Sequence, residues 1–170
     1  MPDTFRLIAS GTVTGSAGDI QFTNIPQTYT DLRLVISAKG RLTSGVAGAM
    51  VIYTATGQSS TLSTWLNAQG DTSGTVSYSS AYPIIGTLVY NTTNIFGITN
   101  VYIPNYTSSA KKFFSTESIT EAQATQAYHS LNGLMIDYTS PISFLGLGDG
   151  SAGGGLAVGT TASLYGIKNS

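Results

Sequence analysis

The sequence predicts an all-β fold, specifically a β-sandwich of jelly-roll type. Three observations support this prediction. Apolar and polar residues alternate along most of the chain, turn-forming residues separate the alternating segments, and small polar residues dominate the composition. Alternation with a period of two is the pattern of a half-buried strand, because successive side chains of a strand point to opposite faces.

The clearest strand is predicted at 31–39. Leu32, Leu34 and Ile36 fall on one face of this segment, and Arg33 falls on the other. We therefore expect the three aliphatic residues to point into the core of the sandwich.

Weaker strand signals occur along the rest of the chain, at 4–9, 19–23, 49–54, 75–79, 84–90, 98–103, 111–119, 127–138, 142–147 and 162–167. These segments give about ten short strands, which is typical of a sandwich or barrel. Residues 61–67 have the propensity for one helical turn, and 121–124 for an even shorter one. The Gly-rich segment 146–159 is expected to form a long hairpin loop.

The composition fits one domain covering residues 1–170. Charged residues make up 9% of the chain, against roughly 25% in an average soluble protein. With 21 Ser, 24 Thr and 20 Gly, three residue types fill 65 of the 170 positions. Thr favours a pleated surface and Gly and Ser favour tight turns, so this composition suits short strands with many connections.

The charge pattern excludes several classes of partner. Seven basic residues are scattered and nearly balance eight acidic ones, which argues against nucleic-acid binding. No apolar run approaches the ~20 residues of a membrane helix. The chain has no cysteine and no visible signal peptide, so we expect it to be made in a cytoplasm.

No pattern in the sequence predicts catalysis. The single histidine, His129, could be matched with Asp137, but no nucleophile motif accompanies them. The loop around Asp149 lacks the repeated carboxylates of a calcium site. The run Gly153–Gly155 lacks the Lys and the following helix of a phosphate-binding loop. We therefore predict a protein that is not an enzyme and that has no catalytic residue, no cofactor and no metal.

Aromatic residues carry a stronger signal. We expect most of the phenylalanines in predicted strands to be core residues, namely Phe5, Phe22, Phe113, Phe114 and Phe144. Trp65, Tyr78 and Tyr82 lie in a polar stretch rich in Ser and Gln, and we predict that they form an interface. The alternative is that these three rings cover the rim of the core.

Three stretches, together with the opening segment 5–10 and the turn before 19–22, carry a family resemblance. They are 25–32 (IPQTYTDL), 101–106 (VYIPNY) and 162–168 (ASLYGIK). In order and spacing they resemble small all-β virion structural proteins of tailed bacteriophages, including those of cyanobacteria and marine bacteria. The resemblance covers nearly the whole chain except 46–93. In it, Tyr29 and Tyr106 read as residues that close a corner of the sandwich with a hydroxyl bond.

This resemblance implies a location in the virion and partners among its proteins. The first hypothesis is a capsid decoration or cement protein on the head surface, bound to the major capsid protein. The alternative is a tail-fibre or host-attachment module that binds a host surface glycan. Sparse charge favours self-association in either case, and we predict a homo-oligomer, with a trimer favoured.

Overall fold

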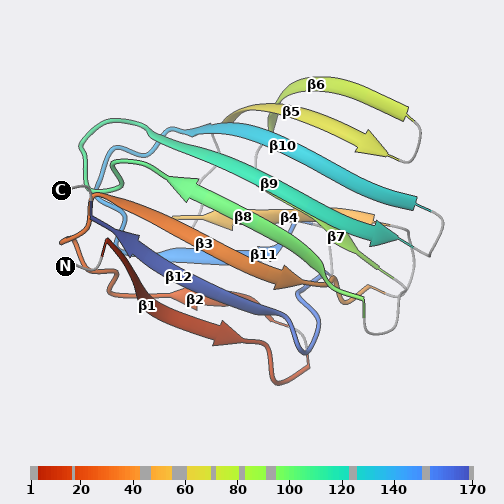
Figure 1. Cartoon of the computed structure of the whole chain (residues 1–170), viewed down its shortest axis with the longest axis horizontal. Helices are drawn as coiled ribbons and strands as arrows, with labels where there is room; N and C mark the ends of the chain where they lie inside the picture. Colours follow the sequence, from red (N-terminus) through yellow and green to blue (C-terminus); the bar gives the residue numbers. More distant parts are fainter. Residues whose placement is uncertain are drawn as a thin grey trace.

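Antiparallel strands form two sheets that pack against each other (Figure 1). The computed structural model describes residues 4–16, 18–42, 47–54, 61–69, 72–80, 83–90, 95–122, 126–150 and 154–168, and for 61–69 and 72–80 it describes the backbone. The strands are β1 (Phe5–Thr12), β2 (Ile20–Phe22), β3 (Asp31–Ala38), β4 (Ala47–Tyr53), β5 (Thr61–Gln69), β6 (Thr72–Ser80), β7 (Ile84–Val89), β8 (Gly97–Ile103), β9 (Lys112–Ala122), β10 (Gln126–Ile136), β11 (Leu145–Asp149) and β12 (Thr161–Ile167). The described residues contain no helix, and so none that is long and apolar enough to cross a membrane. The predicted all-β sandwich is confirmed.

The strand order confirms the jelly-roll topology. The larger sheet has the order β1-β12-β3-β8-β9-β10-β5-β6, and the smaller has the order β2-β11-β4-β7. Without β5, β6, β9 and β10, the remaining eight strands form two four-stranded sheets, β1-β12-β3-β8 and β2-β11-β4-β7, and the chain changes sheet at every connection except that from β4 to β7. Two interlocked Greek keys of this kind define a jelly roll.

The four other strands extend the larger sheet. The hairpin β5–β6 follows β4 in the chain, and the hairpin β9–β10 follows β8. Both add to the β8 side of the sheet, with β10 paired to β9 and to β5. β7, the last strand of the smaller sheet, packs under the first strands of this extension: it lies mainly against β9 and also contacts β10 and β8.

Aliphatic side chains from both sheets fill the core. Leu32 and Leu34 are fully buried and Ile36 is 1% exposed, so the prediction for β3 is confirmed. Ile52 of β4 and Leu88 of β7 face them from the smaller sheet, and both are fully buried. Alternation along each strand thus places one face of each sheet in the core.

The interior becomes polar where β7 packs under the extension. Thr99 donates a hydrogen bond of 2.9 Å to Ser118. Among the described residues, the other buried side-chain polar groups there have no hydrogen-bond partner: the hydroxyls of Thr87, Thr116, Thr120 and Ser130 and both amide atoms of Asn132. Each such group costs about 1–3 kcal/mol of stability, so the sandwich is weaker under the extension than at its aliphatic centre.

A buried tyrosine closes one corner of the sandwich, as the family resemblance implies. Tyr106 is fully buried, and its hydroxyl donates a hydrogen bond to the carbonyl of Pro26. The Tyr106 carbonyl accepts a bond of 3.0 Å from the amide of Ile142. Asn105, just before it, has φ 48°, a left-handed conformation that Asn tolerates. The corner therefore ties together the segments before β3, after β8 and before β11. Tyr29 takes another position, with its ring packed over Gly166.

The structure corrects three predictions. Residues 61–67 belong to strand β5, where pairing with β6 and β10 overrides a local helical propensity. The segment 146–159 is not a hairpin loop, because it begins inside β11 and crosses to the other sheet, where β12 lies. Leu156 anchors this crossing, since it is fully buried and exchanges backbone bonds of 3.1 and 3.2 Å with Gly18.

The third correction concerns the phenylalanines. Phe22 and Phe114 are buried as expected, at 3% and 2% exposure. Phe5 and Phe113 are not core residues, because they are 47% and 54% exposed. Both occupy outward positions of their strands.

Candidate interaction face

The larger sheet turns one face toward the core and the other toward solvent. We call the solvent-exposed face the outer face. It is defined here by the outward residues of β1, β12, β3, β8, β9 and β10. Along β9, even-numbered residues 112–120 are buried and odd-numbered ones are exposed, and this alternation continues in β10 and β8. The cross-strand register then places matching residues in rows that run across the sheet.

Large apolar side chains are concentrated on the outer face. Of nine exposed large hydrophobic residues in the described part of the chain, all but Val158 lie on it: Phe5, Leu7, Val35, Ile98, Tyr102, Phe113, Ile119 and Leu131. The ring of Phe5 also stacks on Tyr165 of β12, with centroids 4.6 Å apart and planes 18° from parallel. An exposed apolar surface of this extent marks a site of contact with another molecule.

A hollow of about 400 Å³ lies within the outer face, over strands β3, β8, β9 and β10. Two adjacent rows of the register supply its walls and floor. Arg33, Tyr102 and Ser115 belong to the first row. Asn100, Glu117 and Leu131 belong to the second row. The hollow thus combines two opposite charges with neutral polar and apolar groups.

Hydrogen bonds hold the ring of Tyr102 at the edge of the hollow. Its hydroxyl donates a bond of 2.7 Å to Asp31, and the other carboxylate oxygen of Asp31 accepts a bond of 2.8 Å from the amide of Asn105. The bond to Asp31, followed by burial, raises the pKa of Tyr102 above its ordinary value. Tyr102 therefore stays neutral and fixed at physiological pH.

The other polar groups of the hollow are available to a ligand or partner. Among the described residues, the side chains of Arg33 and Asn100 have no hydrogen-bond or ion-pair partner. Glu117 lies 3.5 Å from Nε2 of His129, and these side chains are 52% and 47% exposed. Such an exposed contact adds little stability. The Glu117 carboxylate can therefore leave His129 and bind a group of a ligand or partner that interacts with it more strongly.

The three residues predicted as an interface are placed as follows. Trp65 lies in β5, where the register sets it opposite Asn132 of β10 and Val76 of β6. Tyr78 lies in β6, opposite Ser63. Tyr82 lies outside the described residues. Only the backbone of β5 and β6 is described, so an interface through these rings stays a prediction.

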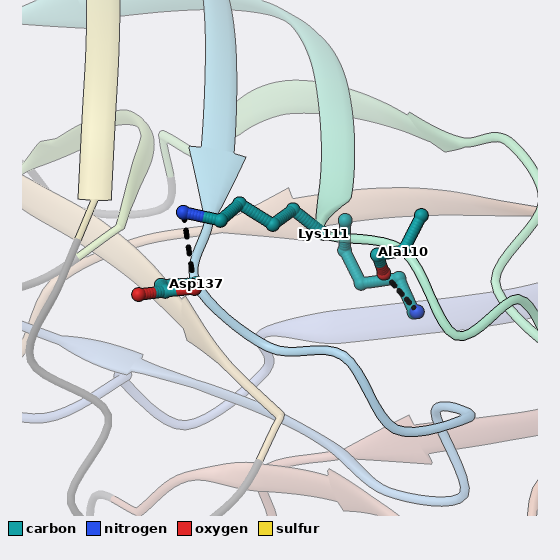
Figure 2. Close-up of polar contacts among 4 residues, drawn as sticks. Ala110, Lys111 and Asp137 are labelled. Carbon is teal, nitrogen blue, oxygen red and sulfur yellow. Dashed lines mark hydrogen bonds and ion pairs between the residues drawn. The ribbon is translucent and has the colours of Figure 1, made fainter.

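The groups considered for catalysis lie apart. His129 and Asp137 are separated by eight positions along an extended segment, about 26 Å at ~3.3 Å per residue. Asp137 instead forms an ion pair of 3.2 Å with Lys111 (Figure 2). Asp149 accepts bonds of 2.8 and 2.9 Å from the hydroxyl of Tyr90. Within the described ranges, no three acidic or histidine side chains gather in a way that could hold a metal ion.

A buried lysine stabilises the loop before β9. Lys112 is 1% exposed, and its ammonium donates hydrogen bonds to the carbonyls of Ser108 and, at 2.7 Å, Ala110. The bond to the Ala110 carbonyl is drawn in Figure 2. Burial lowers the pKa of Lys112 below its ordinary value. Both acceptors are backbone groups of the adjacent loop, so this lysine serves the structure of the loop.

Sequence reasoning missed the outer face because it assigned apolar strand residues to the core. One signal was available. In β9, Phe113 and Ile119 belong to one phase of the alternation and Phe114 to the other, so both faces of the strand carry apolar residues. Comparison of the sequence with family models and with curated proteins gave no match.

Proposed function

We propose that this protein is a structural protein of a phage virion, a decoration protein of the head that binds neighbouring protein subunits through its outer face. The observation that carries the proposal is the concentration of eight large exposed apolar residues on that face. Covering apolar surface gains about 25 cal/mol per Å², which gives such a face a strong tendency to associate.

The remaining support comes from the architecture and the composition. Jelly rolls are common in capsid proteins. The chain has a net charge of −1, so little repulsion opposes dense packing of copies on a particle. No repeat or coiled-coil pattern of a fibre shaft occurs in the sequence.

Copy number tests the location. Quantitative mass spectrometry of purified particles should find hundreds of copies of the chain, as a decoration protein requires. A few dozen copies or fewer would reject decoration, and absence from the particle would reject a virion role altogether.

A pair of variants tests the face. Ile119→Asp places a charge on the outer face, and Val158→Asp places one in a turn of equal exposure, 53% against 56%. The first should reduce the number of copies bound per particle at least tenfold, and the second should leave it unchanged. Equal occupancy of the two variants would show that the outer face is not the contact.

The hollow favours a second candidate function, host attachment through a glycan. Arg33, Asn100 and Glu117 offer hydrogen-bond donors and acceptors beside the ring of Tyr102, as a sugar requires. Titration with neutral mono- and disaccharides at millimolar concentration, followed by NMR, tests it. Amide signals of Ser115 and Gly133 should shift while that of Gln21 on the smaller sheet does not. A spectrum that does not change would reject this candidate.

A further inference from the structure

We infer that a second copy of this chain covers the outer face, related to the first by a two-fold axis. This inference rests on the proposed function, because it names the neighbour that the outer face binds. Three features of the face support it: its extent, the two opposite charges of its hollow, and the positions of these charges on Arg33 and Glu117.

The extent of the face matches that of a dimer interface. The described strands β1, β12, β3, β8, β9 and β10 each have at least 7 residues. Six strands spaced ~4.8 Å apart and ~23 Å long cover roughly 660 Å² in projection. A standard interface buries about 800 Å² per partner, and the projecting side chains raise the accessible area above the projected value.

The positions of Arg33 and Glu117 give the symmetry. Arg33 pairs with Tyr102, and Glu117 pairs with Asn100, on opposite sides of strand β8. The point midway between the two charges therefore lies over Val101. A two-fold axis in the plane of the interface, passing over Val101 at right angles to the line that joins the charges, places Arg33 of each copy opposite Glu117 of the other.

A second copy of the chain then accounts for both the apolar residues of the outer face and the charges of its hollow. An apolar partner surface would cover Ile98, Phe113 and Ile119 but would bury the guanidinium of Arg33 without a counter-charge, which is costly. A second copy supplies apolar residues around the rim and an opposite charge at each side of the hollow. The two Arg–Glu contacts form together, because symmetry repeats the interaction.

This contact differs from the predicted one through Trp65, Tyr78 and Tyr82, since it uses other strands of the sheet. It is also two-fold, whereas the symmetry positions that phage surface proteins occupy on particles led us to favour a trimer. The two contacts are separable by experiment.

The experiment measures self-association of the purified chain by light scattering and sedimentation. The wild type should show a mass twice the 17.7 kDa of the chain at high concentration. Arg33→Glu and Glu117→Arg each place like charges together at both symmetric contacts, and each should raise the dimer Kd about 100-fold. The double variant Arg33→Glu/Glu117→Arg exchanges the charges and should restore the Kd to within about tenfold of the wild type.

Gln21→Glu serves as the control, because Gln21 is exposed on the smaller sheet and its substitution should leave the Kd unchanged. A wild type that stays monomeric at every soluble concentration would overturn the inference. So would a trimer, a dimer that neither single variant weakens, or a double variant as weak as the singles.

The same measurements separate this inference from the proposed function. A monomeric chain that is abundant in purified particles would reject the two-fold dimer and leave the decoration role standing. A chain that forms a charge-dependent dimer in solution but is missing from particles would support the two-fold dimer and reject the decoration role. Circular dichroism of each variant checks that the substitution leaves the fold intact.

Discussion

Removing the hydroxyl of Tyr106 should destabilise the sandwich by about 2 kcal/mol. Tyr106→Phe keeps the fully buried ring and deletes the bonds of the hydroxyl, namely the one to the Pro26 carbonyl and one with the backbone of Tyr29. The net value of such a bond is about 1 kcal/mol, and leaving the acceptor unsatisfied costs about 1–3 kcal/mol. For a chain of this length each kcal/mol lowers Tm by about 2–4 °C, so we expect a fall of about 4–8 °C.

Urea denaturation followed by circular dichroism measures this loss directly. Tyr165→Phe is the matched control, because the Tyr165 hydroxyl has no hydrogen-bond partner in the described structure, and its removal should change stability by less than about 0.5 kcal/mol. If Tyr106→Phe costs no more than this control, the corner bond does not stabilise the fold and the reasoning is refuted.

Three further predictions concern the core and the titratable groups. Leu34→Asp puts an unpaired charge at a fully buried position and should cost more than about 4 kcal/mol by urea titration; a smaller loss would mean that the strand shifts to expose it. Thr116→Val removes an unpartnered hydroxyl and should add about 1 kcal/mol, whereas Thr99→Val breaks the bond to Ser118 and should lower stability; effects of the same sign would contradict the polar interior described above. Burial, and then the bond to Asp19, raise the pKa of Tyr53 from 10.0 to about 12. The contribution of this shift to folding stability is therefore present below about pH 10 and is lost as pH rises to about 12. Tyr53→Phe should make the fall in stability over this range shallower in pH-dependent denaturation, and an unchanged slope would reject that assignment.

The sequence predicted the strands well wherever one face meets the aliphatic core. In β3 the alternation of Leu32, Leu34 and Ile36 has a direct physical cause, since these residues face the smaller sheet while Arg33 and Val35 between them face solvent. The β12 segment follows the same rule, with Leu164 fully buried. Long-range pairing and local pattern agree in these strands, so the pattern is sufficient.

Prediction from the sequence failed for β5 and β9, where the local residue pattern is not that of a strand with one apolar, buried face. In β5, Leu62, Trp65 and Leu66 have the spacing of a helical face, and only pairing with β6 and β10 fixes the extended conformation. In β9, buried Ser118 and Thr120 and exposed Ile119 reverse the usual rule. The sequence shows only that both faces of β9 carry apolar residues, and which of them is buried depends on which strands of the other sheet lie beneath.

The outer face could not be predicted for a related reason. Arg33, Asn100 and Glu117 come from three strands that are distant in sequence, and only the register of β3, β8 and β9 makes them neighbours. The residues singled out from composition, Trp65 and Tyr78, lie on the inserted hairpin β5–β6. A site made from several strands is visible only once the strand order is known.

The pairing of β1 with β12 has a consequence for protein engineering. Phe5 is paired with Ile167, and the amide of Lys168 donates a bond of 3.0 Å to the carbonyl of Thr4, so the two ends of the described chain meet at one corner (Figure 1). A short linker there would close the backbone into a ring without moving a strand. New ends could then be opened at the exposed turn Val158–Gly159, and the same adjacency would allow the whole sandwich to be inserted into a surface loop of another protein.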